Sequence, residues 1–217
     1  MTTLETGAGL CCPTHQLSIR PVPAVIKLGA LPDLIHTALN AAHHVNRQGA
    51  PNDRVAVALP GMHLHRGVAR PGTEVVLFGS QAALERYLLL DGIRRLASRG
   101  MLRDFEVVES MCQPGERGTA YVRDRQAAKR SPGAVRRARA RAERRGISMP
   151  DTIETRQVTR AILALHFGSA VVHVREIEAE ITNGPLSIGT YGFSSISAPA
   201  VLPILSDRST RSLHDAA

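Results

Sequence analysis

The chain has 217 residues, of which 43% are apolar and 3% are aromatic, and its formal net charge is +8. No stretch approaches the roughly 18 consecutive apolar residues of a membrane span, no secretory signal opens the chain, and three cysteines are too few for a disulfide framework. We therefore expect a reduced, cytoplasmic protein with no membrane partner. The ends, residues 1–16 and 207–217, are predicted to be flexible.

The first half, residues 17–112, has the order of elements β-α-β-β-α-β, which predicts a ferredoxin-like domain. Strands are marked by β-branched or alternating apolar residues, and helices by apolar residues three and four apart. A serine cap at Ser80 and the closing Gly100 frame the second helix, with a break near Asp91. The predicted elements are strand 17–28, helix 31–45, strand 54–60, a loop, strand 73–80, helix 80–100 and strand 104–111.

The second half, residues 119–206, is less regular. A strand over 120–126 leads into a basic segment, a short helix is predicted around residues 150–165, and residues 171–181 alternate as a strand. A turn at 183–185 and a Gly/Ser-rich end complete it. The fold class is therefore α+β, with a helix of about 131–146 inside the second half.

The positive charge is concentrated in that basic segment. Residues 123–145 contain ten basic and two acidic side chains, whereas the rest of the chain has 17 of each. On a helical wheel five arginines share one face, opposite Val135, Ala138 and Ala142. These arginines are Arg136, Arg137, Arg141, Arg144 and Arg145. The segment is open to three interpretations: a solvated helix, a disordered basic tail, or a helix that binds an RNA duplex or a DNA groove through guanidinium forks.

The chain contains nine histidines, which could bind a metal ion or act in acid–base catalysis. A zinc site could be assembled from His43, His44, His63, His65, Cys11 and Cys12. That signal is weak, because no CxxC or HExxH frame accompanies it, and we expect neither a metal nor another cofactor. His36 lies within the periodic first helix, where it is either an ordinary half-buried residue or a general base with a pKa near neutrality.

Several motifs, in order, resemble the CRISPR repeat-cleaving endoribonucleases of subtype I-F. LIHTALN is similar to the family's first-helix motif, which carries its catalytic histidine. YVRDRQAAKRSPGAVRRARARAERRG resembles its arginine-rich helix region, and NGPL and TYGFSS resemble two signatures near its end. The resemblance covers roughly residues 17–206.

The resemblance implies a metal-independent endoribonuclease on two ferredoxin-like halves, the second diverged and of the RAMP type. It would bind the stem-loop of CRISPR repeat RNA and cleave at its 3′ side by 2′-hydroxyl attack, leaving a 2′,3′-cyclic phosphate. It would then stay on the mature guide RNA with other subunits of a CRISPR effector complex. By this resemblance His36 is the general base, and Tyr191 and Ser169 complete the catalytic site. The implied RNA-binding residues are Arg123, Arg125, Gln126, Lys129, Arg136, Arg137, Arg139, Arg141, Arg144 and Arg145.

The sequence also departs from the family. The serine expected before GPL matches only Ser169, at a displaced position, and the loop MHLHRGVAR differs. These departures suggest a diverged relative of the type IV or transposon-associated kind. Two alternatives stay open: a non-catalytic RNA-hairpin-binding subunit on the same scaffold, and a basic DNA-binding adaptor.

Overall fold

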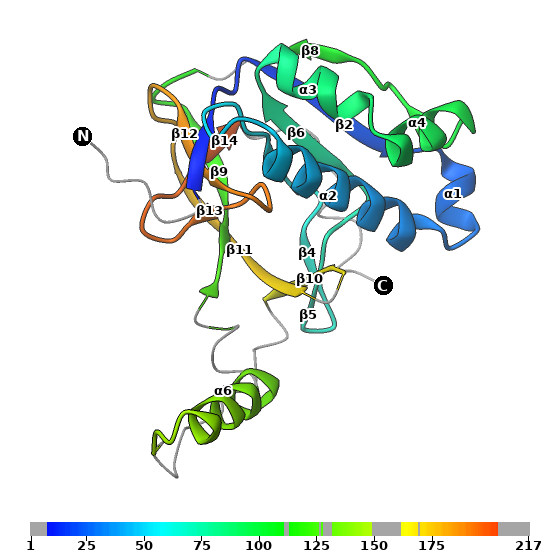
Figure 1. Cartoon of the computed structure of the whole chain (residues 1–217). Coiled ribbons are helices and arrows are strands. Elements are labelled where there is room, and N and C mark those ends of the chain that lie inside the picture. The colour runs from blue at the N-terminus through cyan, green and yellow to red at the C-terminus, as the bar shows by residue number, and fades with distance from the viewer. Residues whose placement is uncertain are drawn as a thin grey trace.

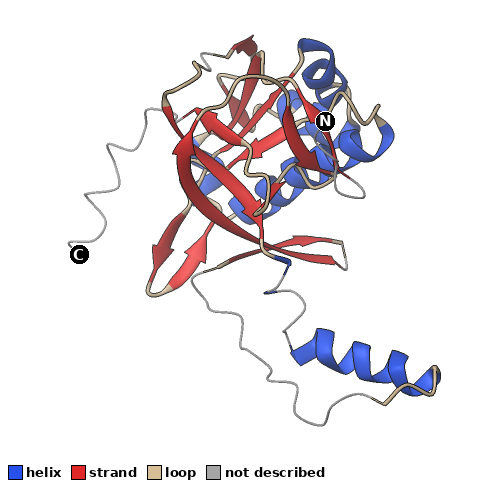
Figure 2. Ribbon diagram, turned by 90° about the vertical axis from the view of Figure 1, so that its left-hand side faces the viewer, coloured by secondary structure: helices blue, strands red, loops and turns tan. Residues whose placement is uncertain are grey.

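The computed structural model describes residues 8–110, 113–125, 127, 132–148, 162–168 and 170–203. These residues form a mixed α+β fold (Figures 1 and 2). None of the helices in these ranges is both long enough and apolar enough to cross a bilayer. Several predictions fall outside the described residues: Gln126, Lys129, Ser169, the cap of the basic helix, much of the helix expected at 150–165, and the tail at 207–217.

One sheet belongs to the first half of the chain. Its strand order is β3-β6-β2-β7, and β8 pairs with β2 on the same edge as β7. Every pairing in it is antiparallel. The strands are β2 (His15–Pro21), β3 (Ala56–Ala58), β6 (Val75–Gly79), β7 (Leu102–Arg103) and β8 (Val107–Glu109). The strands predicted near 54–60, 73–80 and 104–111 are thus confirmed, in shortened form. The strand predicted over 17–28 is confirmed only as far as Pro21 and is wrong beyond it, because Pro23–Lys27 is helical.

The helices of this half pack along the sheet (Figure 1). They are α1 (Pro23–Lys27), α2 (Leu31–Gln48), α3 (Gln81–Leu88) and α4 (Asp91–Ser98). The α2 residues predicted to form its apolar face, among them Leu34, Ala38 and Leu39, are buried. The predicted cap is confirmed, because the Ser80 hydroxyl accepts a hydrogen bond from the Ala83 amide at 3.0 Å. The predicted break before Asp91 is also present.

A short hairpin replaces the loop expected between the second and third strands of this half. Strands β4 (His63–His65) and β5 (Val68–Arg70) pair antiparallel. All three β4 residues are exposed, whereas Ala69 on β5 is buried in the core. The hairpin therefore projects from the body while its base stays anchored (Figure 1).

A second sheet is built from the second half, with strand order β10-β11-β9-β13, and β14 pairs with β9 as well. Its strands are β9 (Arg117–Arg123), β10 (Leu163–Phe167), β11 (Ala170–Glu180), β13 (Ser194–Ser195) and β14 (Val201–Pro203). The helix predicted around 150–165 is wrong over its last residues, which begin β10. There Leu163, Leu165 and Phe167 are buried and the residues between them are exposed, which is the period of a strand.

Residues 8–11 form a strand that is part of the fold. Strand β1 (Ala8–Cys11) pairs antiparallel with β12 (Leu186–Gly189), and Cys11 is fully buried. The prediction of a flexible extension is therefore wrong for residues 8–16, because the long-range partner of β1 lies near the other end of the chain.

One hydrophobic cluster runs through both halves. It includes Val57 and Leu39 from the first half and Tyr121, Val174 and Phe193 from the second. The buried Arg54 adds a polar link, because its guanidinium Nη1 donates to the Ile188 carbonyl at 2.7 Å. Residues of α2 and of the second sheet are thus held at fixed positions relative to each other.

Helix α6 (Pro132–Arg144) stands apart from both sheets (Figures 1 and 2). It matches the arginine helix predicted at about 131–146. Its C-terminal end is a Schellman motif: Gly146 has φ of +64°, its amide donates to the Glu143 carbonyl, and the Ile147 amide donates to the Ala142 carbonyl. Within residues 132–148 the basic segment is therefore a helix with a defined C-terminal cap, and not a disordered tail.

Candidate functional site

The loop between β12 and β13 places Tyr191 against the first half of the chain. Its turn is closed by a hydrogen bond from the Gly192 amide to the Gly189 carbonyl at 3.0 Å. The Gly192 carbonyl then accepts from the Val57 amide on β3 at 2.8 Å. Gly192 has φ of +82°, and a Cβ there would lie 2.3 Å from a Val57 methyl group. Only glycine fits this turn without strain, so the Tyr-Gly pair fixes the tyrosine at this place.

His43 on α2 faces that loop. Its Nδ1 lies 3.0 Å from the Thr190 carbonyl oxygen, and because a carbonyl only accepts, Nδ1 carries the hydrogen. The neutral ring then has its lone pair on Nε2. Burial lowers the pKa of His43, and Arg47 and His44 lower it further, while the bond to Thr190 opposes them. His43 is therefore held neutral, in one tautomer, with a basic nitrogen available.

Three rings from three elements meet at this point. The His43 and Tyr191 rings stack with centroids 4.3 Å apart and planes 6° from parallel. Phe167, the last residue of β10, meets both rings edge-on, at 5.8 Å from His43 and 4.8 Å from Tyr191. We call His43, Phe167 and Tyr191 the ring cluster. It ties the imidazole on α2 to β10 of the second sheet and to the β12–β13 loop, and restricts its rotation.

Arg123, the last residue of β9, adds a positive charge to the ring cluster. Its guanidinium carbon lies 5.0 Å from the centroid of the Tyr191 ring, within cation–π range. Burial lowers the pKa of Arg123 and Arg125 lowers it further, whereas Tyr191 raises it. The group nonetheless stays protonated in any ordinary buffer. Its buried Nε has no hydrogen-bond partner among the described residues.

Asp124 orients the chain between the two arginines. Its buried carboxylate pairs with Arg175 on β11 at 2.5 Å and accepts from the Ala127 amide at 2.9 Å. Its own amide donates to the His173 carbonyl at 2.8 Å. Both interactions of the carboxylate are therefore local: one holds Arg175 on β11 and the other closes the turn from Asp124 to Ala127. Of the arginines on either side of it, Arg123 lies against the Tyr191 ring and Arg125 is exposed.

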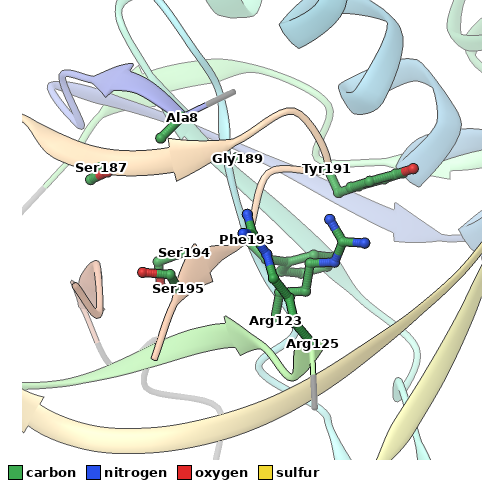
Figure 3. Close-up of a pocket in the computed structure, with 9 residues that line it drawn as sticks. All are labelled: Ala8, Arg123, Arg125, Ser187, Gly189, Tyr191, Phe193, Ser194 and Ser195. Atoms are coloured by element: carbon green, nitrogen blue, oxygen red, sulfur yellow. The ribbon is translucent and has the colours of Figure 1, made fainter. Parts of the chain in front are cut away.

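A small hollow opens beside the ring cluster (Figure 3). Its volume is about 30 Å³, and Figure 3 shows the side chains of Arg123 and Arg125 rising from the end of β9 beneath the Tyr191 loop. Serine hydroxyls from the facing strands complete the lining. The described residues around the hollow are Ala8, Arg123, Arg125, Ser187, Gly189, Tyr191, Phe193, Ser194 and Ser195.

His36, the residue expected to be the general base, is not part of the ring cluster. It lies on α2 seven residues before His43, two helical turns away on the same face. Its side chain is exposed, and its Nε2 lies 2.8 Å from the Nδ2 of Asn40, which donates to it. From the sequence, His43 was considered only as a candidate zinc ligand. Its separation of seven residues from His36 could have shown that the two histidines lie on the same face of α2.

The predicted RNA-binding arginines divide into two groups. Arg123 and Arg125 lie at the hollow, whereas the others are exposed on α6 or in the turn after it: Arg136, Arg137, Arg139, Arg141, Arg144 and Arg145. On the opposite face of α6 Val135 is buried, and Ala138 and Ala142 are half-buried, as the wheel predicts. Gln126, Lys129 and Ser169 lie outside the described residues.

The described residues contain no group of three or more His, Cys, Asp or Glu side chains arranged to hold a metal ion. The zinc set considered from the sequence is not assembled, because Cys11 is buried and donates to the Phe78 carbonyl while His63 is exposed on the hairpin.

No family model matches the chain, and no curated protein matches it significantly.

The candidate site consists of a neutral, oriented imidazole within a ring cluster, two arginines at an adjoining hollow, and a separate arginine helix.

Proposed function

We propose that this protein is a metal-independent endoribonuclease that binds an RNA stem-loop and cleaves beside it, with His43 as the general base. The observation that supports this best is the single tautomer of His43, because it leaves on Nε2 the lone pair that accepts a proton, and the lowered pKa keeps that nitrogen unprotonated. The resemblance of the motif order to CRISPR repeat-cleaving enzymes supports the choice of RNA.

The reaction needs only a base and a positive environment. Nε2 of His43 takes the proton of a ribose 2′-hydroxyl, and the oxygen attacks the adjacent phosphorus. The bond to the 5′-oxygen breaks, that oxygen takes a proton from solvent, and a 2′,3′-cyclic phosphate remains. Arg123 lies against Tyr191 and supplies positive charge where the phosphate gains negative charge.

Tyr191 acts on the imidazole, not on the phosphate. It stacks on His43 in nearly parallel planes and follows directly after Thr190, whose carbonyl fixes the tautomer. The place in the catalytic site that the resemblance implies for Tyr191 therefore stays a proposal, in which Tyr191 positions His43 and not His36.

The scaffold proposal is a ferredoxin-like first half joined to a diverged second half. It is supported by the order of the first sheet, in which β3, β6, β2 and β8 lie side by side as the second, third, first and fourth strands of such a unit would. Taken in chain order these strands are one to four, and the sheet order is two-three-one-four, all antiparallel. The helices α2 and α3 follow the first and third strands.

RNA binding is assigned to α6, with the stem-loop of a CRISPR repeat as the partner. Its exposed arginines form one charged face on a helix that stands away from the body, which favours an elongated polyanion. Retention of the cleaved RNA within a CRISPR effector complex, in the cytoplasm, completes the proposal.

The test is cleavage of labelled repeat RNA in EDTA. We expect one cut at the 3′ side of the stem and a cyclic phosphate end. A substrate with a single 2′-deoxy sugar at that position should bind equally well and stay intact. Cleavage of the deoxy substrate, or a requirement for a divalent metal, would exclude the mechanism. Binding without any cleavage would favour the non-catalytic hairpin-binding subunit, and equal affinity for duplex DNA would favour the DNA adaptor.

A further inference from the structure

The hollow beside the ring cluster has the properties of a small anion site. Two arginines approach it from one strand end, and no acidic side chain is among the described residues that line it. The one carboxylate next to them in sequence, Asp124, is engaged by Arg175 at 2.5 Å. Two positively charged side chains therefore line the hollow together with no described acidic residue, and an anion bound there would be attracted by both.

Arg123, Arg125 and Ser187 line the hollow and carry hydrogen-bond donors that can bind the oxygen atoms of an anion. The buried Nε–H of Arg123 has no acceptor among the described residues, which is a costly state unless a ligand supplies one. The hydroxyl of Ser187 also lines the hollow, whereas the hydroxyls of Ser194 and Ser195 already bond to Tyr121 and Ser197. One guanidinium edge, a second guanidinium and a hydroxyl are groups that bind a phosphate.

Size distinguishes a phosphate from a base. The volume of about 30 Å³ holds about two water molecules, and so accommodates the two non-bridging oxygens of a cyclic phosphate but not an unstacked nucleobase. The position also fits, because Tyr191 and Arg123 line the hollow and belong to the site where His43 acts.

We propose that this hollow binds the phosphate at the 3′ end of the cleaved RNA, through Arg123, Arg125 and Ser187. The inference rests on the proposed function for its ligand. It gives product retention a physical cause. A newly formed 2′,3′-cyclic phosphate stays against the two arginines after the leaving strand departs.

The experiment titrates the protein with 2′,3′-cyclic and 3′-mononucleotides of all four bases, and with the four nucleosides as controls. The readout is the Nε–H NMR signal of Arg123, assigned with Arg123→Lys. We expect nucleotides to shift this signal with dissociation constants in the millimolar range, and nucleosides to leave it unchanged. Arg125→Ala should weaken nucleotide binding about tenfold, since one charge-assisted contact is lost.

Arg117→Ala is the matched control, because Arg117 lies at the opposite end of β9, is exposed, and does not line the hollow. It should leave nucleotide affinity within about twofold. Equal shifts with nucleosides, no shift with any nucleotide, or equal losses in the Arg117 and Arg125 variants would overturn the phosphate site. The titration needs no cleavage, so it distinguishes failure of this site from failure of the proposed endoribonuclease.

Discussion

The ring cluster and α6 are opposite kinds of surface. In the ring cluster, side chains from α2, β10 and the β12–β13 loop converge, and His43 has its hydrogen bond, its stacking partner and its protonation state all set by neighbours. On α6 the arginines are exposed and two of them, Arg141 and Arg144, donate back to carbonyls of their own helix. The first region fixes one group in one state; the second presents charge without fixing it.

Under the proposed function, this difference assigns the chemical step and the affinity for RNA to separate parts of the molecule. Changes in the ring cluster should lower the rate of the chemical step. Changes on α6 should lower affinity and leave that step intact.

The largest expected effect is on the general base. His43→Phe keeps an aromatic ring for Tyr191 to stack on but removes the basic nitrogen, so the single-turnover cleavage rate should fall by about 10²–10⁴-fold. His36→Ala, on the same face of α2 two turns away, is the matched control and should change the rate by less than about threefold. If His36→Ala abolishes cleavage while His43→Phe does not, the base has been assigned to the wrong histidine.

The second-largest expected effect is on the RNA affinity that we assign to α6. Replacing both Arg137 and Arg141 by alanine should weaken RNA binding, and the slope of log affinity against log salt should become smaller by roughly 1–2 units, since about two phosphate contacts are lost. The same double change at Arg94 and Arg95 on α4 removes equal charge from a different helix. A slope that changes equally in both double variants would show that α6 does not face the RNA.

A third change tests how the β12–β13 loop holds Tyr191. Gly192→Ala forces a side chain into the left-handed region and against Val57, and we expect the free energy of unfolding to fall by about 1–3 kcal/mol. Gly115→Ala is the control, because its φ of +84° carries the same backbone strain but nothing lies within 4 Å of its added Cβ. Urea unfolding compares the two variants. Equal losses would mean that contact with Val57 contributes nothing.

The smallest effect is on the pH dependence of cleavage. Because burial, Arg47 and His44 lower the pKa of His43, the base should stay unprotonated to lower pH than an ordinary histidine. The acidic limb of the pH–rate profile should therefore have its midpoint below the ordinary value of about 6.5. Arg47→Ala removes one positive neighbour and should move this midpoint upward. A downward movement would mean that His43 is not the titrating group.

Much of this arrangement was predictable from local pattern. The period of α2, the Ser80 cap, the break before α4 and the two faces of α6 follow from spacing and from turn residues, and each is confirmed. Tyr191 was also identified, although only because TYGFSS resembles a signature of the CRISPR repeat-cleaving enzymes.

The rest depends on contacts between distant residues. His36 and His43 occupy the same face of α2, so helical period alone does not distinguish them; the choice depends on where the β12–β13 loop meets the helix. The pairing of β1 with β12 joins residues almost 180 positions apart, and no local pattern announces it. Strand β10 was mistaken for the end of a helix although Leu163, Leu165 and Phe167 alternate, a signal of period two within a short segment.

The most direct test compares two variants at saturating protein. Single-turnover cleavage of the repeat RNA is measured for His43→Phe and for the Arg137 and Arg141 double variant, with protein in excess of each variant's dissociation constant. The account predicts that saturation restores the rate of the α6 variant to near that of the wild type and leaves His43→Phe slow by about 10²-fold or more. A fully active His43→Phe protein, or an α6 variant that stays slow at saturation, would contradict it.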